Sequence, residues 1–311
     1  MKLVATRKIL LLGGTGQLGV ELQSALVDIG QVYAPTREDL DVGSFFEVSK
    51  CIDLYQPDII LNAAAYTAVD KAEVEVDNAM LINASLPSLL AKKSSELGAI
   101  LIHYSSDYVY PGTGSTPWTE ESDVSPLSVY GRSKLAGDES VLSSHCRHWI
   151  FRTSWIYAAH GNNFMRTMLR LGVKHDSLRV VHDQIGAPTP AKLIAQVTSE
   201  AIRQQIPTGL YHLTAGGSTS WHGFAQAIFR HAISRGIAFK IHPDNVEGIL
   251  TQDYPTPARR PLNSRLSSKK LETELGLSLP AWDSQLILTL NEFFEENYLN
   301  DGSDSDILSD A

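Results

Sequence analysis

The residues most suited to take part in a reaction are Tyr130 and Lys134, which stand four positions apart in the segment SVYGRSK, residues 128–134. In a helix, residues four apart lie on the same face, one turn from each other. A free phenol has a pKa of about 10, and a fixed ammonium beside it favours the phenolate and lowers that pKa. The pair could therefore give a proton to a carbonyl oxygen that gains negative charge. The alternative is that Tyr130 packs and Lys134 is solvated, because so short a pattern arises often by chance.

Ser106 offers a third group for the same chemistry. It follows the apolar run 99–104, which is typical of a buried parallel strand. Hydroxyls at the carboxyl end of such a strand lie where α/β proteins bind their ligands. Ser106 could therefore hydrogen-bond a carbonyl oxygen together with Tyr130. A capping or turn role is the alternative, since isolated serine pairs often have one.

A glycine-rich turn near the start of the chain indicates a site for a dinucleotide. The apolar run 8–12 predicts a buried strand, residues 13–19 (GGTGQLG) follow it, and residues 20–26 have helical spacing. Glycines let the backbone turn tightly and approach a pyrophosphate, and the free amides of the helix N-terminus attract that anion. A plain structural loop is the alternative.

The end of the second predicted strand, residues 31–34, bears on the choice of cofactor. An acidic residue about 20 positions after the glycines would bind the ribose of NADH. Thr36 and Arg37 stand there instead, and a guanidinium suits a phosphate in charge and geometry. We therefore expect NADPH, with NADH as the alternative. Arg37 could instead be a surface charge that pairs with Glu38 or Asp39.

Two further stretches could complete the wall of a cofactor site. Asp41 and Val42 close the loop after the second strand, where they could bracket an adenine. Small residues at positions 63–67 (AAAYT) follow the predicted strand 57–62 and would leave room for a ligand across the sheet edge. Close packing of a helix would explain the small residues equally well.

Strands and helices alternate from residue 8 to residue 153, which predicts an α/β fold with a Rossmann-type doubly wound parallel sheet. The rhythm changes at residue 161, which indicates a smaller, mixed C-terminal lobe. We expect a dinucleotide-binding domain over residues 1–155, with residues 188–208 packing back on it. Residues 156–187 and 209–300 would form a substrate-binding lobe. Residues 301–311, which are acidic and polar, would be a disordered tail.

Composition excludes several classes of protein. The chain has 311 residues, 43% hydrophobic and 20% charged, with a formal net charge of -9, which argues against a nucleic-acid partner. The sequence has no apolar segment of the roughly 18 residues that a membrane span needs. Its two cysteines cannot form a disulfide framework and its ten histidines have no metal-binding spacing, so we expect a cytoplasmic protein without a metal centre.

A local basic cluster stands out in this acidic chain. Arg259, Arg260 and Arg265 lie within and just after the extended segment 254–261. They either form a solvated face or hold an anionic group such as a diphosphate.

Taken together, these motifs resemble the extended short-chain dehydrogenase/reductase superfamily and, within it, the dTDP-4-dehydrorhamnose reductases. The resemblance spans about residues 8–298, in both expected lobes. It is carried by the segments 62–73 (NAAAYTAVDKAE), 104–112 (YSSDYVYPG), 129–137 (VYGRSKLAG), 151–155 (FRTSW), 161–164 (GNNF), 183–189 (DQIGAPT) and 254–261 (YPTPARRP).

This resemblance implies reduction of dTDP-4-dehydro-L-rhamnose at C4 to dTDP-L-rhamnose. It implies that Tyr130 is the proton donor, that Lys134 holds the nicotinamide ribose, and that Ser106 replaces the usual threonine. The implied cofactor-binding residues are Gly13, Gly16, Gln17, Leu18, Gly19, Arg37, Asp41, Val42, Ala65, Tyr66, Thr67, Tyr104, Tyr130 and Lys134. The implied substrate-binding residues are Val69, Asp70, Ser106, Asp107 and Trp155 for the sugar, with Asn163 and Arg260 on the diphosphate side.

One departure concerns assembly. Some members of the family dimerise through a magnesium ion held by glutamates. Glu21 matches one such position, but Lys192 stands where another glutamate aligns. We therefore expect a monomer or a weak homodimer, and magnesium is left open.

Two other functions remain as alternatives. The resemblance also reaches the non-catalytic, dinucleotide-binding regulatory subunit of methionine adenosyltransferase, although the Tyr130/Lys134 pair is intact here. An epimerase or dehydratase could use the same scaffold. A dehydratase would be expected to carry Asp-Glu directly after the serine or threonine, whereas Asp107 is followed by Tyr108.

Overall fold

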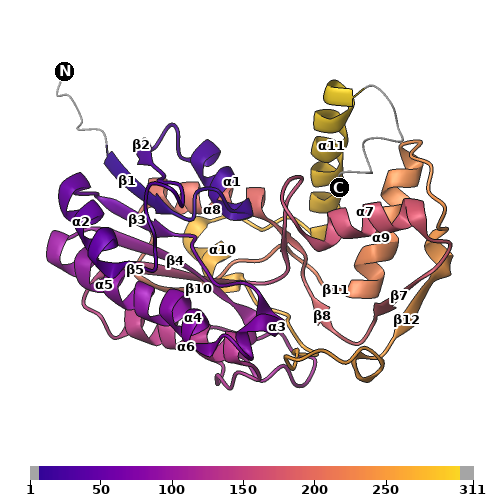
Figure 1. Ribbon diagram of the computed structural model, residues 1–311, viewed down its shortest axis with the longest axis horizontal. Coiled ribbons are helices and arrows are strands. Elements are labelled where there is room, and N and C mark those ends of the chain that lie inside the picture. Colours follow the sequence, from indigo (N-terminus) through magenta and orange to yellow (C-terminus); the bar gives the residue numbers. More distant parts are fainter. Residues whose placement is uncertain (1–6, 302–311) are drawn as a thin grey trace.

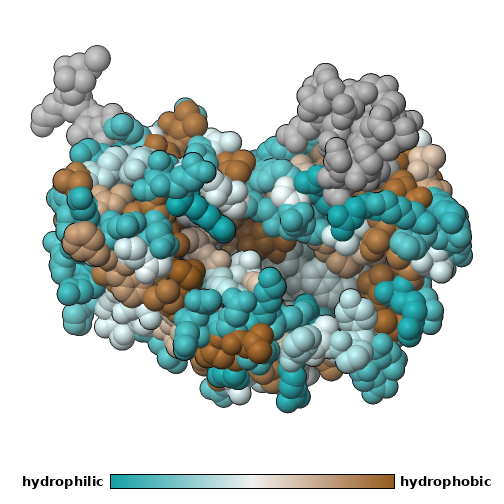
Figure 2. Space-filling view, in the orientation of Figure 1, coloured by the Kyte–Doolittle hydropathy of each residue, from teal (hydrophilic) through white to brown (hydrophobic). Residues whose placement is uncertain are grey.

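The computed structural model describes residues 7–301, with side chains through residue 295, and arranges them as two lobes beside a cleft (Figures 1 and 2). The predicted α/β Rossmann-like fold is confirmed. Six strands form one parallel sheet in the order β2-β1-β3-β4-β5-β10. The strands are β1 (Arg7–Leu12), β2 (Gly30–Tyr33), β3 (Ile59–Asn62), β4 (Ile100–Ser106), β5 (Arg147–Thr153) and β10 (Gly209–His212).

The strand order determines where a ligand can bind. From β1 the chain passes to β2 on one side and then to β3 on the other, so the direction of winding reverses between β1 and β3. The helices that follow β1 and β3 lie on opposite faces of the sheet. A crevice therefore opens between them at the carboxyl ends of the strands. The glycine turn directly follows β1 and therefore lies in that crevice.

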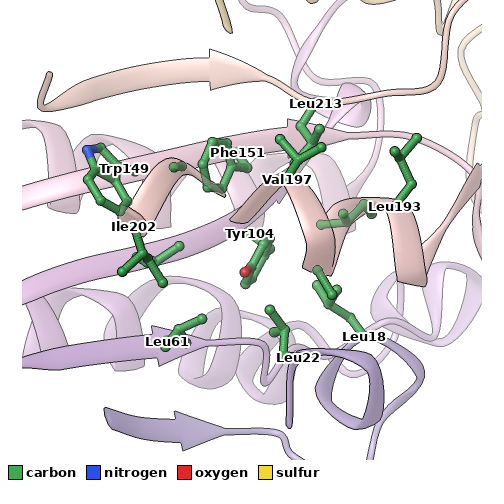
Figure 3. Close-up of a cluster of buried hydrophobic side chains, with 14 of the residues drawn as sticks. Leu18, Leu22, Leu61, Tyr104, Trp149, Phe151, Leu193, Val197, Ile202 and Leu213 are labelled. Atoms are coloured by element: carbon green, nitrogen blue, oxygen red, sulfur yellow. The ribbon is translucent and has the colours of Figure 1, made fainter. Parts of the chain in front are cut away.

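Helices cover both faces of the sheet because its central strands are apolar on both sides. One face carries α1 (Gln17–Ala25), α8 (Ala191–Gln204) and α10 (Lys269–Leu275). The other carries α2 (Phe45–Tyr55), α5 (Leu86–Leu97) and α6 (Val129–Leu142). Figure 3 shows the first face, where Leu22 of α1 and Val197 of α8 pack toward Leu61, Tyr104 and Phe151 of the sheet.

Two elements differ from the expected division of the chain: α10, which packs on the main sheet although residues 209–300 were assigned to the substrate lobe, and the strand β10. Residues 209–212 were assigned to the substrate lobe, but β10 pairs with β5 and forms an edge of the main sheet. Its register brings Tyr211 beside Phe151, and both rings are buried in the core under α8. The ring of Tyr211 is therefore buried by the main sheet and not by the second lobe. The boundary at residue 155 stays a prediction.

The second lobe is smaller and is built on helices. Phe224, Phe229 and Phe293 are fully buried in its core. Its helices are α7 (Phe164–Lys174), α9 (Trp221–Ser234) and α11 (Trp282–Asp301). Its short strands pair as β6 (Ile156–Tyr157) with β9 (Thr189–Pro190), β7 (Leu178–Val181) with β12 (Val246–Ile249), and β8 (Ile185–Gly186) with β11 (Thr219–Ser220).

The remaining elements are short. A π-helical turn (Leu81–Ser85) joins α4 to α5, and a 3₁₀ turn (Asp107–Val109) follows β4 directly. The others are α3 (Val69–Ala72), α4 (Val76–Met80) and 3₁₀ turns at Pro243–Asn245 and Thr251–Asp253. Among residues 7–301, no helix combines the length and apolarity that a membrane crossing requires. The predicted tail was residues 301–311; Asp301 is instead the last residue of α11, and residues 302–311 lie outside the described residues.

Candidate active site

A cleft of about 1000 Å³ lies at the carboxyl ends of the parallel strands, between the two lobes. Figure 2 shows the hollow at the centre of the molecule. Most residues proposed from the sequence line it, namely Gly13, Gly16, Gln17, Leu18, Arg37, Asp41, Val42, Ala65, Tyr66, Thr67, Val69, Tyr104, Ser106, Asp107, Tyr130, Lys134 and Trp155. These residues come from segments up to 142 positions apart, and the sheet edge brings them together.

The glycine turn is shaped as a cradle for a ligand. Gly13 has a φ of +81°, which favours glycine, and a Cβ there would lie 2.6 Å from the backbone of Ala63. A Cβ on Gly19 would collide with the carbonyl oxygen of Gly13, so Gly19 allows α1 to pack against the turn. Gly16 precedes the first residue of α1, whose free amides face the cleft end of the sheet. This backbone fits a pyrophosphate.

Arg37 lies exposed at the rim of the cleft, beside Thr36. Asp39, an alternative partner for Arg37, accepts hydrogen bonds from the Thr36 amide (3.0 Å) and hydroxyl (2.7 Å). These bonds lower the pKa of Asp39. Arg37 thus stands after the second strand among the residues that line the cleft.

Tyr130 is held at the first turn of α6. The side chain of Ser128 caps that helix by accepting from the amide of Gly131 at 3.1 Å. The ring of Tyr108 packs edge-on against Tyr130, with centroids 5.4 Å apart. Burial raises the pKa of Tyr130, and the hydrogen bond from Ser106 opposes that rise. The predicted lowering of this pKa is therefore wrong, because the loss of water around the phenol raises the pKa more than the hydrogen bond with Ser106 lowers it.

Lys134 is buried, with only 2% of its surface exposed, and Nζ donates to the carbonyl oxygen of Tyr104 at 2.7 Å. Burial lowers the pKa of Lys134 to about 8, while the charge of Asp138 opposes this shift. Asp138 is one helical turn further along α6 and accepts from Arg152 Nε at 2.9 Å. The ammonium is thus held by the backbone carbonyl of Tyr104, and the charge of the buried Asp138 carboxylate favours its charged form.

Asp107 is a buried carboxyl group next to Ser106. The Ser106 hydroxyl donates to Asp107 Oδ1 at 3.2 Å, and it also accepts from the amide of Tyr108 at 3.2 Å. Burial raises the pKa of Asp107 to about 7, although hydrogen bonds from Ser264 and Ser106 oppose the rise. A group with this pKa can hold or release a proton near neutral pH, inside the cleft.

Three residues proposed for the substrate side have other partners. Arg260 Nη2 lies 2.8 Å from Asp70 Oδ2, so these two predicted ligand-binding residues form an ion pair across the lobes. Asn163 caps α7 by accepting from the amide of Arg166 at 3.1 Å, and its Nδ2 donates to Gln17 Oε1 at 2.9 Å. Its amide group is therefore engaged by the protein, which argues against the predicted diphosphate contact.

Two aromatic residues of the cleft were missed by the sequence reasoning. Tyr108 lines the cleft beside Tyr130, and Trp221 lines it from the second lobe. The motif segment that contains Tyr108 could have indicated that residue. No spacing pattern in the sequence indicates that Trp221 lines a binding site. It follows Ser220, which caps α9, and so has the position of an ordinary first helical residue.

The residues that align with a magnesium site do not fit one. Glu21 pairs with His160, whose Nε2 lies 3.0 Å from Glu21 Oε1. Lys192 pairs with Glu292 at 3.0 Å, so the position that aligns with a second glutamate carries an ammonium in place of a carboxylate. Within the part of the chain that the structure describes, there is no cluster of three or more potential metal ligands.

Comparisons with known proteins all lead to one family. Residues 7–295 match the model of the family described as the RmlD substrate binding domain. A dTDP-4-dehydrorhamnose reductase of Shigella flexneri is 48% identical over 295 residues, covering 92% of this chain and 98% of that protein. The reductase of Escherichia coli strain K12 is 46% identical, with the same coverage.

Two solved structures are similar over the same span. The reductase of Clostridium acetobutylicum has a TM-score of 0.86 at 37% identity, over 92% of this chain and 99% of that one. The reductase of Bacillus anthracis, solved in complex with NADP, has a TM-score of 0.86 at 34% identity and the same coverage. With the family model matched almost from end to end, this chain belongs to the dTDP-4-dehydrorhamnose reductase family.

Proposed function

We propose that this chain reduces the C4 ketone of dTDP-4-dehydro-L-rhamnose to give dTDP-L-rhamnose, with NADPH as the reductant. The observation that carries the proposal is the meeting of Ser106, Tyr130 and Lys134 in one cleft with the glycine cradle after β1. A ketone reduction needs these two parts together: a site for the reductant and an acid for the oxygen.

The residues of the cleft suit the cofactor. Gly13 and Gly16 would receive the pyrophosphate, Lys134 would hold the nicotinamide ribose, and Arg37 would bind the 2′-phosphate that distinguishes NADPH from NADH. When bound, the nicotinamide supplies the hydride. The complex of the Bacillus anthracis relative with NADP supports this choice of cofactor.

Tyr130 would give its proton to the C4 oxygen as that oxygen gains charge. A proton donor must be protonated at working pH, and the burial that raises the pKa of Tyr130 keeps its hydroxyl neutral. The ammonium of Lys134 would then stabilise the phenolate that remains. Ser106 would orient the ketone, because its hydroxyl lies between Asp107 and Tyr130.

The test is the oxidation of NADPH by purified protein with dTDP-4-dehydro-L-rhamnose, followed by absorbance. We expect turnover with this substrate, a lower kcat/KM with NADH, and a loss on the order of 100-fold or more in kcat for Tyr130→Phe. Cofactor affinity of the variant should be unchanged, since only one hydroxyl is removed. Absence of turnover by the wild type would refute the reaction, and full turnover by Tyr130→Phe would refute the assigned acid.

We further infer that the enzyme works as a monomer or weak homodimer without a bridging metal. The ion pair of Lys192 with Glu292 supports this, since a fixed ammonium repels a divalent cation. Dialysis against EDTA should leave both kcat and the sedimentation coefficient unchanged. Dissociation of a stable dimer on removal of the metal would contradict the inference.

A further inference from the structure

Trp155 and Trp221 form a stacked pair that joins the two lobes. Their ring centroids lie 3.7 Å apart and their planes meet at 12°. Trp155 follows β5 of the main sheet, and Trp221 is the first residue of α9 in the second lobe. Both residues line the cleft, so one face of the site is an aromatic wall with a contribution from each lobe.

Trp155 has a backbone conformation that its own side chain disfavours. Its φ is +50°, in the left-handed region that bulky residues rarely adopt. Such a residue persists only where its surroundings hold it there. A Cβ on Gly186 would lie 2.8 Å from Cε2 of Trp155, so the missing side chain at Gly186 makes the space for the indole.

Trp221 is held in place by the second lobe. Its Nε1 donates to Gln184 Oε1 at 3.2 Å, and Gln184 Nε2 donates to the hydroxyl of Thr251 at 3.1 Å. The ring of Phe164 packs on Trp221 with centroids 4.7 Å apart. The antiparallel pairing of β8 with β11 places Gly186 opposite Thr219, two residues before Trp221. Trp221 is thus the fixed member of the pair.

We propose that Trp221 is a positioning residue for the sugar of the substrate, which it serves by holding the indole of Trp155 in its strained orientation. This rests on the proposed reductase function. Trp221 takes no part in proton or hydride transfer. The stacked pair lines the cleft, so its apolar ring surface can pack against the C–H side of a hexose, and a fixed wall would hold C4 toward Tyr130. Without Trp221, Trp155 would relax to an ordinary backbone conformation and the wall would move.

Kinetics of three substitutions test the proposal. Trp221→Leu removes the stack and should raise KM for the ketosugar about tenfold while KM for NADPH changes less than about twofold. Trp221→Phe keeps an aromatic face and should raise it less than about threefold. Gly186→Ala places a methyl group 2.8 Å from Cε2 of Trp155, so it should displace the indole and act like Trp221→Leu. Trp118→Leu is the matched control, because Trp118 stacks on Tyr110 outside the cleft, and it should leave the ketosugar KM unchanged.

Circular dichroism gives a readout that does not depend on turnover. Two indoles stacked in contact couple their transitions and give a split band in the far ultraviolet. The wild-type spectrum should contain this band, Trp221→Leu should lose it, and saturation with dTDP-L-rhamnose should change it because the sugar contacts Trp155.

Three results would overturn the proposal: no split band in the wild type, an unchanged ketosugar KM in Trp221→Leu, or an equal rise of both KM values with a lowered Tm. The last result would mean that Trp221 only supports the fold. If the wild type does not turn over the ketosugar but its split band responds to dTDP-L-rhamnose, the proposed reaction fails. The role of Trp221 in placing a bound sugar would then still be supported.

Discussion

Lys134 points its ammonium at the backbone of Tyr104, with Nζ 2.7 Å from the carbonyl oxygen. This bond ties α6 to β4, the strand that also carries Ser106 at its end. The helix that presents Tyr130 is therefore fixed to the strand that presents Ser106, and the two hydroxyls keep their relative positions. Such preorganisation is what an acid needs to meet a bound ketone at the right distance.

The charge of Lys134 should set the alkaline limit of activity. Burial lowers its pKa from 10.5 to about 8, so the ammonium is present below that pH and is lost as pH rises through it. We expect kcat/KM to fall above a pH of about 8. A pH profile with the cofactor below saturation measures this. The guanidinium of Lys134→Arg stays charged, so any activity that remains in this variant should not fall above pH 8. A wild-type kcat/KM that stays constant to pH 10.5 would contradict the role of the Lys134 charge.

Removal of the Ser106 hydroxyl should slow the reaction without weakening the cofactor. Ser106→Ala deletes a hydrogen-bonding group at the developing charge, which costs on the order of 100-fold in kcat. Ser106→Thr keeps the hydroxyl and should stay within a few-fold of the wild type. Steady-state kinetics and NADPH titration measure the two effects. Equal kcat values for Ser106→Ala and the wild type would exclude an orienting role.

Asp107 should make the protein less stable as pH rises. Its pKa is raised from 3.8 to about 7, so between these values the folded chain binds more protons than the unfolded chain. Folding stability therefore falls with rising pH in this window. Asp107→Asn removes the titration, and at pH 8 it should be more stable than the wild type by a few kcal/mol. Urea denaturation at pH 5 and pH 8 measures the difference, and parallel behaviour of the two proteins would refute it.

Asp70 and the substrate should compete for Arg260. The side chains of Asp70 and Arg260 form an ion pair at 2.8 Å. Each is partly exposed, so this ion pair adds little to the stability of the fold. If Arg260 binds the diphosphate, Arg260→Gln should weaken dTDP binding about tenfold, whereas Asp70→Asn should leave it equal or tighter. Calorimetric titration with dTDP gives both values. An equal loss in the two variants would show that the ion pair serves only to join the lobes.

Local patterns in the sequence were enough to predict the sheet lobe, and together with the family resemblance they predicted most of the cleft lining. A buried strand, a glycine turn and a helix can each be recognised from neighbouring residues, because apolar runs, glycines and helical spacing act over a short range. The carboxyl ends of parallel strands then meet at one edge, so Gly13 and Ser106 had to approach each other. The assignment of β10 to the wrong lobe arose because a short apolar strand does not specify its partner.

Tertiary structure alone decided the electrostatics and the contacts between lobes. Spacing places Lys134 beside Tyr130, but burial determines the direction of the pKa shift, and burial depends on the whole fold. The pairing of Arg260 with Asp70 and the stacking of Trp155 on Trp221 join residues 190 and 66 positions apart, respectively. No local pattern encodes such contacts, because they form only when two separately packed cores are brought face to face.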